Sequence, residues 1–219
     1  MDLTISVLTY EGEALLPDCL QSIWRQDPQM DHEVLVVDNG STHPVDTILG
    51  RAVRLPHNIG NIGGMNACLK EASGEWVLFV ANDVRLDPDC VNTLWKYRAS
   101  LTQPVLYQPD GAIDNAGLRW VWPGYGIRKR AFSGNGAILQ SIPSFAATCF
   151  LLQRRVWKEL GGFAEELGVS HEDIDFALKL QKSGYGSFVN TEASATHLMG
   201  RTIGRVTRVP LSPMYRRAR

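Results

Sequence analysis

The chain has 219 residues, of which 44% are hydrophobic, so it can bury one substantial core or, at most, the cores of two small domains. It contains no apolar run near the roughly 20 residues that a bilayer-spanning helix needs, and no secretory signal is visible at its start. These features exclude an integral membrane protein and favour a cytoplasmic one, with peripheral attachment to a membrane as the alternative.

Charge is distributed unevenly along the chain. The net charge is −1, yet residues 201–219 hold six arginines and no acidic residue, which leaves 16 basic and 23 acidic residues in positions 1–200. Such a basic tail suits an anionic partner, for example a phosphate-bearing ligand, an acidic membrane face or nucleic acid. Other arrangements stay open: a solvated or disordered end, docking on the domain, and exchange between the protomers of a homodimer.

The four cysteines are widely spread and form no CxxC pair. Cys19 and Cys68 fall among apolar residues in helix-like segments, so we expect buried free thiols. A structural zinc site would need closely spaced ligand pairs, and the sequence has none.

Strand and helix signals alternate along the first half of the chain. In the last helix of this half, Asp87 is expected to be the N-cap and Pro88 the first helical residue. The predicted order is strand 3–9, helix 14–26, strand 32–41, strand 52–56, helix 63–73, strand 75–81 and helix 87–100. This order indicates an α/β fold with a Rossmann-like, mostly parallel sheet flanked by helices.

The second half begins with a segment of different character. Residues 108–136 are rich in glycine, aromatic and basic residues without a clear period, which is typical of hairpins and long loops that shape a pocket. The remaining predicted elements are strand 145–153, helix 154–162, helix 171–185 and strand 187–200. We therefore expect one domain over residues 1–200, followed by the tail.

Polar residues follow the predicted strands of the first half at the points where those strands end. In a parallel sheet these carboxyl ends share one edge, where ligands bind. Any one of these groups could be an ordinary turn, but four together favour a binding site. The groups are Thr9-Tyr10-Glu11, Asp38-Asn39-Gly40, Asn58-Ile59-Gly60 and Asn82-Asp83.

Several stretches in this order resemble the family 2 glycosyltransferases of the GT-A fold, particularly the branch with rhamnosyl- and galactofuranosyl-transferases. Each motif is weak alone, but the ordered set is specific and covers roughly residues 3–202. The stretches are SVLTYEGEALLPDCLQSIWRQ, VLVVDNGST, NIGNIGGMNACLKEASGEWVLFVANDV, DGAIDNAG, HEDIDFALKLQKSGY and THLMGRT. The resemblance implies a nucleotide-sugar-binding half at 1–107 and an acceptor and catalytic half at 108–200.

Sugar transfer from a nucleotide diphosphate commonly uses a divalent cation, manganese or magnesium, to neutralise the departing diphosphate. The resemblance implies that Asp83 and His197 hold this cation. Arg201, four residues after His197, could contact the diphosphate through its planar guanidinium. Many relatives have Asp-x-Asp where this chain reads Ala81-Asn82-Asp83, so one carboxylate is missing. Alternatively, Asp83 is a turn residue, His197 is structural and Arg201 begins the tail.

The stretch HEDIDF places three acidic residues at a predicted helix start. An inverting transfer needs a carboxylate that takes the proton of the acceptor hydroxyl. Matching to the family motif points to Asp173 as this base and to Glu172 as a residue that positions the acceptor. The alternative is an ordinary acidic first turn, which the helix dipole favours.

The donor nucleotide is expected to bind at the strand ends, where Asp38 could accept from the base or ribose and Tyr10 could stack on the base. Glycines near residue 60 would let the backbone approach the sugar and phosphates. A dinucleotide-binding dehydrogenase is disfavoured because GxGxxG is absent and the glycines follow the third strand. The full set of expected donor-binding residues is Thr9, Tyr10, Glu11, Asp38, Asn58, Gly60, Gly63, Gly64, Asn66, Asn82 and Arg201.

Together these features predict a metal-dependent, inverting hexosyl- or deoxyhexosyl-transferase that uses a UDP- or dTDP-sugar. Its acceptor would be a hydroxyl on a glycan, a lipid-linked intermediate or another molecule. Two alternatives are a non-catalytic nucleotide-sugar-binding module of the same fold and a glycosyltransferase that acts on nucleic acid.

Overall fold

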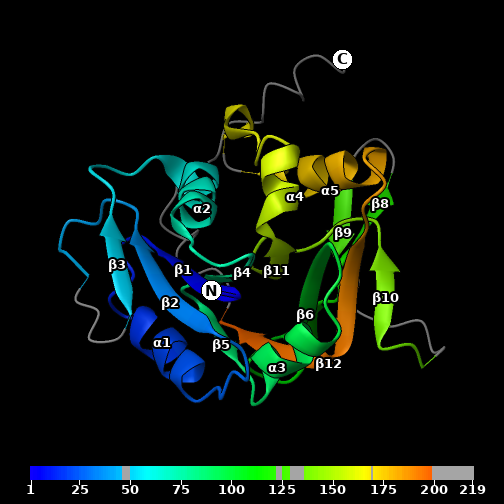
Figure 1. Cartoon of the computed structure of the whole chain (residues 1–219), viewed down its shortest axis with the longest axis horizontal. Helices are drawn as coiled ribbons and strands as arrows, with labels where there is room; N and C mark the ends of the chain where they lie inside the picture. Colours follow the sequence, from blue (N-terminus) through cyan, green and yellow to red (C-terminus); the bar gives the residue numbers. More distant parts are fainter. Residues whose placement is uncertain (46–49, 122–124, 129–135, 169, 199–219) are drawn as a thin grey trace.

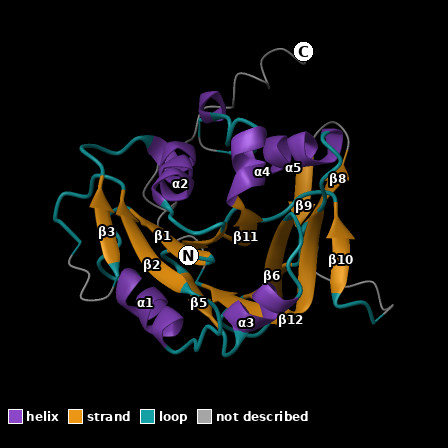
Figure 2. Ribbon diagram, viewed as in Figure 1, coloured by secondary structure: helices purple, strands orange, loops and turns teal. Residues whose placement is uncertain are grey.

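The computed structural model describes residues 1–45, 50–121, 125–128, 136–168 and 170–198. In the described part of the chain up to residue 96, each helix follows one or two strands (Figures 1 and 2). The helices are α1 (Leu16–Trp24), α2 (Gly60–Glu71), α3 (Cys90–Lys96), α4 (Arg154–Glu159) and α5 (Glu172–Lys182), with a short 3₁₀ turn at Glu165–Leu167. The strands are β1 (Leu3–Thr9), β2 (His32–Asp38), β3 (Arg51–Arg54), β4 (Trp76–Ala81), β5 (Val84–Leu86), β6 (Leu101–Tyr107), β7 (Ile113–Asn115), β8 (Leu118–Val121), β9 (Tyr125–Arg128), β10 (Leu139–Ile142), β11 (Cys149–Gln153) and β12 (Ser187–His197).

One mixed sheet runs through the molecule in the order β10-β12-β6-β11-β4-β1-β2-β3. Strands β3, β2, β1 and β4 are mutually parallel, β11 is antiparallel to both of its neighbours, and β12 is parallel to β6. The short strands β5 and β7 pair with β12 and β6. The expected α/β arrangement with a mostly parallel sheet is therefore present, and its strands come from both halves of the chain.

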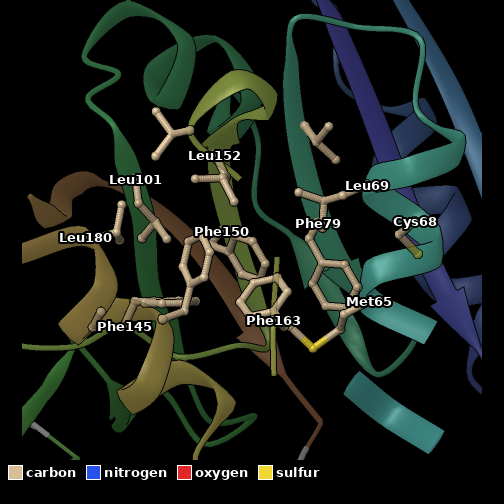
Figure 3. Close-up of a cluster of buried hydrophobic side chains, with 14 of the residues drawn as sticks. Met65, Cys68, Leu69, Phe79, Leu101, Phe145, Phe150, Leu152, Phe163 and Leu180 are labelled. Atoms are coloured by element: carbon tan, nitrogen blue, oxygen red, sulfur yellow. The ribbon is translucent and has the colours of Figure 1, made fainter. Parts of the chain in front are cut away.

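Helices cover both faces of this sheet, with α2, α4 and α5 on one side and α1 and α3 on the other (Figure 1). The core under α2, α4 and α5 contains a group of phenylalanines (Figure 3). Phe150 of β11 lies with its ring centroid 5.2 Å from Phe79 and 5.0 Å from Phe145, and Phe163 lies 4.6 Å from Phe176 of α5. These contacts fix α5, and the acidic residues at its start, against the sheet.

The core under α1 and α3 buries the apolar side of each helix. Leu16, Leu20 and Ile23 recur at helical spacing in α1 and are all buried. The four cysteines are buried free thiols, as the sequence predicts. Burial raises the pKa of the Cys68 thiol to about 12, so this thiol stays protonated.

Two sequence-based assignments in this region were wrong. The helix predicted at 87–100 begins at Cys90, with Asp89 as its N-cap in the left-handed conformation (φ 61°). Asp87 does not cap the helix because its carboxylate accepts a hydrogen bond from the Ser194 hydroxyl at 2.6 Å, and its N–H donates to the Ser194 carbonyl. The other error is the end of that prediction at residue 100, since α3 stops at Lys96 and β6 follows.

None of the helices in the described part of the chain combines the length and apolar character that a bilayer crossing would need.

Candidate active site

The ends of β1 and β4 are joined by their own side chains. Thr9 and Asn82 are almost fully buried, and the Asn82 amide donates to the Thr9 hydroxyl at 2.9 Å. A Cβ added at Gly12 would overlap both of these side-chain groups. The hydrogen bond therefore depends on a glycine at position 12, and it fixes the backbone immediately before Asp83.

The loops that follow β1 and β2 are also joined to each other. The Glu11 carboxylate accepts from the backbone N–H and the hydroxyl of Thr42 at 2.7 and 2.8 Å, and these bonds lower the pKa of Glu11. The Glu11 N–H in turn donates to the Ser41 hydroxyl at 2.9 Å. Tyr10 lies between Thr9 and Glu11, which are both held by hydrogen bonds, and it is 38% exposed. Its ring is therefore available to a ligand.

Asp38 lies buried at the end of β2. One carboxylate oxygen accepts from the Ser41 N–H at 2.9 Å, and the other lies 3.7 Å from the Arg54 guanidinium without a hydrogen bond. A buried acceptor with unused capacity is costly unless a ligand completes it. This oxygen is therefore a suitable acceptor for a hydroxyl or N–H of a bound nucleoside.

The loop before α2 is organised by Asn39. Its amide donates to the Asn58 side chain at 3.1 Å and to the Gly60 carbonyl at 3.0 Å, while its oxygen accepts from the Ile59 N–H at 3.1 Å. Gly60 has a positive φ of 84°, and a Cβ there would meet only open space. The Gly60 N–H donates to the Asn58 side chain at 2.8 Å, so both backbone polar groups of Gly60 are bonded within the protein, while the space beside its Cα is open.

The other two glycines of this stretch, Gly63 and Gly64, pack closely against neighbouring side chains. A Cβ added at Gly63 would lie 3.1 Å from the side chain of Ile59, and one at Gly64 would lie 2.7 Å from the side chain of Leu8 on β1. Glycine at position 64 thus allows α2 to approach the sheet closely.

Asn66 of α2 uses its whole amide inside the protein. Its nitrogen donates to the Phe163 carbonyl at 2.9 Å and to Glu165 at 2.8 Å, and its oxygen accepts from the Phe163 N–H at 3.0 Å and from Trp157 at 3.2 Å. The side chain therefore ties the donor-side helix to the segment that leads into α5.

Asp83 and His197 lie together, although 114 positions separate them in the sequence. Strand β5 pairs with the end of β12, which brings His197 Nε2 to 3.3 Å from the Asp83 carboxylate. His197 Nδ1 lies 2.9 Å from the carboxylate of Asp114 on β7. Burial lowers the pKa of His197, but the hydrogen bonds and charges of the two carboxylates outweigh it and leave the pKa raised.

This arrangement fits a divalent cation. Cis ligands of an octahedral ion at about 2.1 Å lie about 3 Å apart, close to the separation of Asp83 and His197 Nε2. Oxygen and imidazole donors together suit manganese, and a carboxylate suits magnesium. In the described portion of the chain, no three side chains of the usual ligand types gather into a complete metal site. Phosphate oxygens and water would have to supply the other ligands.

Glu172 and Asp173 begin α5 and are both largely buried. Asp173 accepts from the Ile174 N–H at 2.7 Å, while one oxygen of Glu172 has no hydrogen-bond partner. Loss of solvation, with a smaller effect from the neighbouring Glu172 charge, raises the pKa of Asp173 to about 7. Loss of solvation also raises the pKa of Glu172. Such a carboxylate can take a proton near neutral pH.

A short segment after β6 connects the histidine pair with the start of α5. Asp114 contacts His197, and four residues later Leu118 pairs with Ser144. The Ser144 hydroxyl donates to the backbone carbonyl of Asp173 at 2.9 Å. The candidate metal pair and the candidate base are thus attached to one stretch of chain.

Sequence reasoning missed three residues that organise these sites, and it named Asn39 only as a member of the group Asp38-Asn39-Gly40. Ser41 stands in a turn-like run and Gly12 has no motif of its own, so neither gave a separate signal. Asp114 gave a weak signal, as an acidic residue in the stretch DGAIDNAG, which mixes apolar and polar residues. Arg201, expected at the diphosphate, lies outside the described residues.

Known proteins are similar in sequence to most of this chain. The O-antigen biosynthesis protein RfbC of Myxococcus xanthus is 29% identical over 195 residues, which are 78% of this chain and 15% of that protein. The N-acetylglucosaminyl-diphospho-decaprenol L-rhamnosyltransferase of Mycobacterium tuberculosis is 24% identical over 213 residues, covering 78% of this chain and 68% of that enzyme. The chain therefore spans between about a seventh and about two thirds of these two relatives.

Solved structures support the fold. The crystal structure of GalNAc-T7 with UDP, GalNAc and Mn²⁺ superimposes with a TM-score of 0.74 at 15% identity, over 90% of this chain and 44% of that one. This likeness confirms the predicted GT-A architecture. The sequence profile described as "Glycosyl transferase family 2" matches residues 4–161, well over half of the chain. The chain therefore belongs to glycosyl transferase family 2.

Proposed function

We propose that this chain is a metal-dependent, inverting glycosyltransferase that moves a sugar from a UDP- or dTDP-sugar to a hydroxyl acceptor. The observation that carries the proposal is Asp173, a partly buried carboxyl with no cationic partner among the described residues, whose pKa is raised to about 7. A module that only binds nucleotide sugars has no use for such a base, and a purely structural residue at this position would be more stable as an amide.

The donor would bind along the ends of β1, β2 and β4. The oxygen of Asp38 that lies near Arg54 without a hydrogen bond would accept from the base or ribose, and the exposed ring of Tyr10 would stack on the base. The open space beside the Gly60 Cα would let the sugar or phosphates approach the chain there. Thr9, Glu11 and Asn82, whose polar groups are already bonded within the protein, would hold these groups in place.

Asp83 and His197 would hold the manganese or magnesium ion. When bound, the ion would supply positive charge near the diphosphate that leaves the sugar. Among the described residues we assign only these two ligands, so we expect the ion and the nucleotide diphosphate to bind together, each strengthening the other.

Asp173 would act on the acceptor. Its carboxylate takes the proton of the acceptor hydroxyl as that oxygen forms its bond to the anomeric carbon, and the bond from this carbon to the diphosphate oxygen breaks. Attack from the face opposite the leaving group gives inversion. Glu172, directly before the base, would position the acceptor. In this proposal residues 1–107 form the donor half and residues 108–200 the acceptor half.

The relatives suggest a class of acceptor. One of them is named for rhamnosyl transfer to N-acetylglucosaminyl-diphospho-decaprenol and another for O-antigen biosynthesis. We accordingly propose a lipid-linked or polymeric glycan as acceptor and a hexose or deoxyhexose as the transferred sugar. An anionic surface that carries such an acceptor would also suit the basic residues 201–219.

Calorimetric titration of UDP and dTDP, with and without manganese, tests the donor site. Wild type should bind one of the two nucleotides more tightly with manganese, and Asp83→Ala should lose that gain while keeping metal-free binding. Asp18→Asn, a change on the surface of α1, is the matched control and should behave as wild type. Binding that ignores both manganese and the Asp83 substitution would refute the metal role.

Turnover with the donor nucleotide so identified separates an enzyme from a binding module. Asp173→Asn should keep donor binding and lose hydrolysis or transfer of the donor sugar. A wild-type protein that binds the nucleotide sugar and never turns it over, with any glycan or lipid-linked acceptor tried, would favour the binding module instead. Strongly salt-dependent binding of oligonucleotides would favour a nucleic-acid acceptor.

A further inference from the structure

Asp114 lies in the core beside the candidate metal pair. Strand β7 pairs with β6 through Tyr107 and Leu106, and β12 pairs with the same two residues of β6 from the other side. Asp114 therefore reaches His197 across the end of β6, and their side chains meet at 2.9 Å. Asp114 is 1% exposed and His197 9% exposed, so water screens this contact little.

The chemistry of the two groups fixes where the imidazole proton lies. A carboxylate can only accept hydrogen bonds, so His197 must carry a proton on Nδ1 to bond Asp114. In the neutral ring the remaining nitrogen, Nε2, then presents a lone pair toward the Asp83 carboxylate, 3.3 Å away. Two electron-rich groups at this distance repel each other unless a proton or a metal ion lies between them.

We propose that Asp114 is a positioning residue that locks the ring orientation and the Nδ1–H tautomer of His197, so that Nε2 faces the divalent cation together with Asp83. The inference rests on the proposed metal role of Asp83 and His197. Carboxylate partners of this kind orient metal-binding histidines in many proteins, and their loss typically weakens metal binding by about 10- to 100-fold.

A purely structural role for Asp114 makes a different expectation. A structural contact would contribute to folding alone, and a neutral hydrogen-bonding substitute would serve equally well. A positioning role predicts that the tautomer of His197 and the affinity for the ion change together. The His197 imidazole is buried and has one carboxylate beside each ring nitrogen. This arrangement favours a positioning role, because packing alone does not require two carboxylates around one ring.

Two measurements on three variants test the proposal. Asp114→Ala removes the acceptor, and Asp114→Asn keeps the size and one acceptor oxygen without the charge. The control is Asp87→Asn, which alters a carboxylate bonded to Ser194 on the same strand β12. The first measurement is the manganese affinity in the presence of saturating UDP or dTDP. The second is the tautomer of His197 in metal-free protein, read from long-range ¹H–¹⁵N imidazole spectra at a pH where the ring is neutral, with His197→Gln identifying its signals.

Wild type should show the Nδ1–H tautomer. Asp114→Ala should shift His197 toward the Nε2–H form and weaken manganese binding by about 10- to 100-fold, with metal-free nucleotide binding unchanged. Asp114→Asn should lose less than the alanine variant, and Asp87→Asn should match wild type in both measurements.

An unchanged tautomer in Asp114→Ala, or manganese affinity equal to that of wild type, would overturn the positioning role. Equal losses in Asp87→Asn would overturn it too, because they would reflect a general disturbance of β12. If wild type fails to bind manganese with either nucleotide, the proposed metal role fails. The tautomer of His197 then still decides whether Asp114 orients the ring. If Asp114→Ala does not fold, the asparagine variant carries the test.

Discussion

Replacing Asp173 with asparagine should stabilise the protein while abolishing turnover. The pKa of this carboxyl rises from the ordinary 3.8 to about 7, chiefly because burial removes water from the charged form. A shift of that size corresponds to at most about 4 kcal/mol of cost for holding the charge in the folded state. Because the side chain is only partly shielded, we expect about 1–3 kcal/mol. Asparagine keeps the oxygen that accepts from the Ile174 N–H and carries no charge.

The sign of the pH dependence follows from linkage. Between about pH 4 and pH 7 the folded protein keeps a proton on Asp173 that the unfolded chain has released, so wild-type stability falls as pH rises through this window. The amide variant lacks this loss. Its advantage in the free energy of unfolding should therefore be largest near about pH 8 and shrink toward about pH 5.

Chemical denaturation at both pH values measures the advantage, and steady-state kinetics measure turnover. Wild-type kcat/KM should rise with pH through about 7, as the base loses its proton, and Asp173→Asn should lose about 10²- to 10⁴-fold in kcat. Asp175→Asn is the control on the same helical turn. It breaks a partly exposed 2.9 Å ion pair with Lys179 and should cost at most about 1 kcal/mol, with kcat unchanged.

An Asp173→Asn protein that is less stable than wild type near neutral pH would refute the reasoning, since the carboxylate would then be a stabilising structural group. A wild-type pH profile that is flat between about pH 5.5 and about pH 8.5 would also refute it, because the base would titrate elsewhere.

Three further substitutions test how the site is supported. Phe176→Ala empties a fully buried position beside Phe163 and should cost about 3–5 kcal/mol in denaturant unfolding; a loss below about 1 kcal/mol would contradict the packing of α5. Gly12→Ala should separate Thr9 from Asn82, cost about 1–3 kcal/mol and weaken UDP or dTDP binding in calorimetry; unchanged nucleotide affinity would show that this hydrogen bond does not shape the donor site. Asn66→Leu leaves the backbone N–H and carbonyl of the buried Phe163 without this partner and should cost about 1–3 kcal/mol, with kcat falling more than nucleotide affinity; the reverse pattern would place Asn66 at the donor itself.

Strands β1, β2 and β4 were predictable because each is a short apolar run bounded by turn residues. The three-residue strand β5, which brings Asp83 to His197, was not predicted. The pairing of Asp83 with His197 followed from family resemblance alone, since no local pattern relates positions so far apart. Their separation of 3.3 Å agrees with that expectation, although their role as metal ligands stays a prediction.

Strand β6 was not predictable from local pattern. Its sequence LTQPVLY carries Gln103 and Pro104 in the middle, and proline inside a strand normally argues against a central position. The structure accommodates both: β11 pairs only with the first two residues of β6, and the buried Gln103 side chain accepts from the Ala146 N–H at 2.7 Å. Missing β6 also hid Asp114, because β7 is three residues long and has meaning only as a partner of β6.

The side chains at the strand ends illustrate a second limit. Sequence places Thr9 and Asn82 at the edge where a ligand should bind, which is where the structure has them. It cannot tell that each satisfies the other, because that depends on the distance between two strands and on a glycine that leaves room. Residue type and strand position therefore predict a site better than they predict which of its members face the ligand.

The two candidate acidic residues differ in a way that assigns their work. Asp83 shares the space between β5 and β12 with an imidazole, so its charge already has a partner that a cation can replace. Among the described residues, the hydrogen bonds to Asp173 come from the backbone and its neighbour Glu172 is another carboxyl, so its charge is unfavourable and its affinity for a proton is high. Two carboxyl groups in such different environments differ in their affinity for a proton. One fold can therefore use one of them to bind a cation and the other to transfer a proton. Exchanging the two environments would leave a cation site that prefers a proton and a base too weak to accept one.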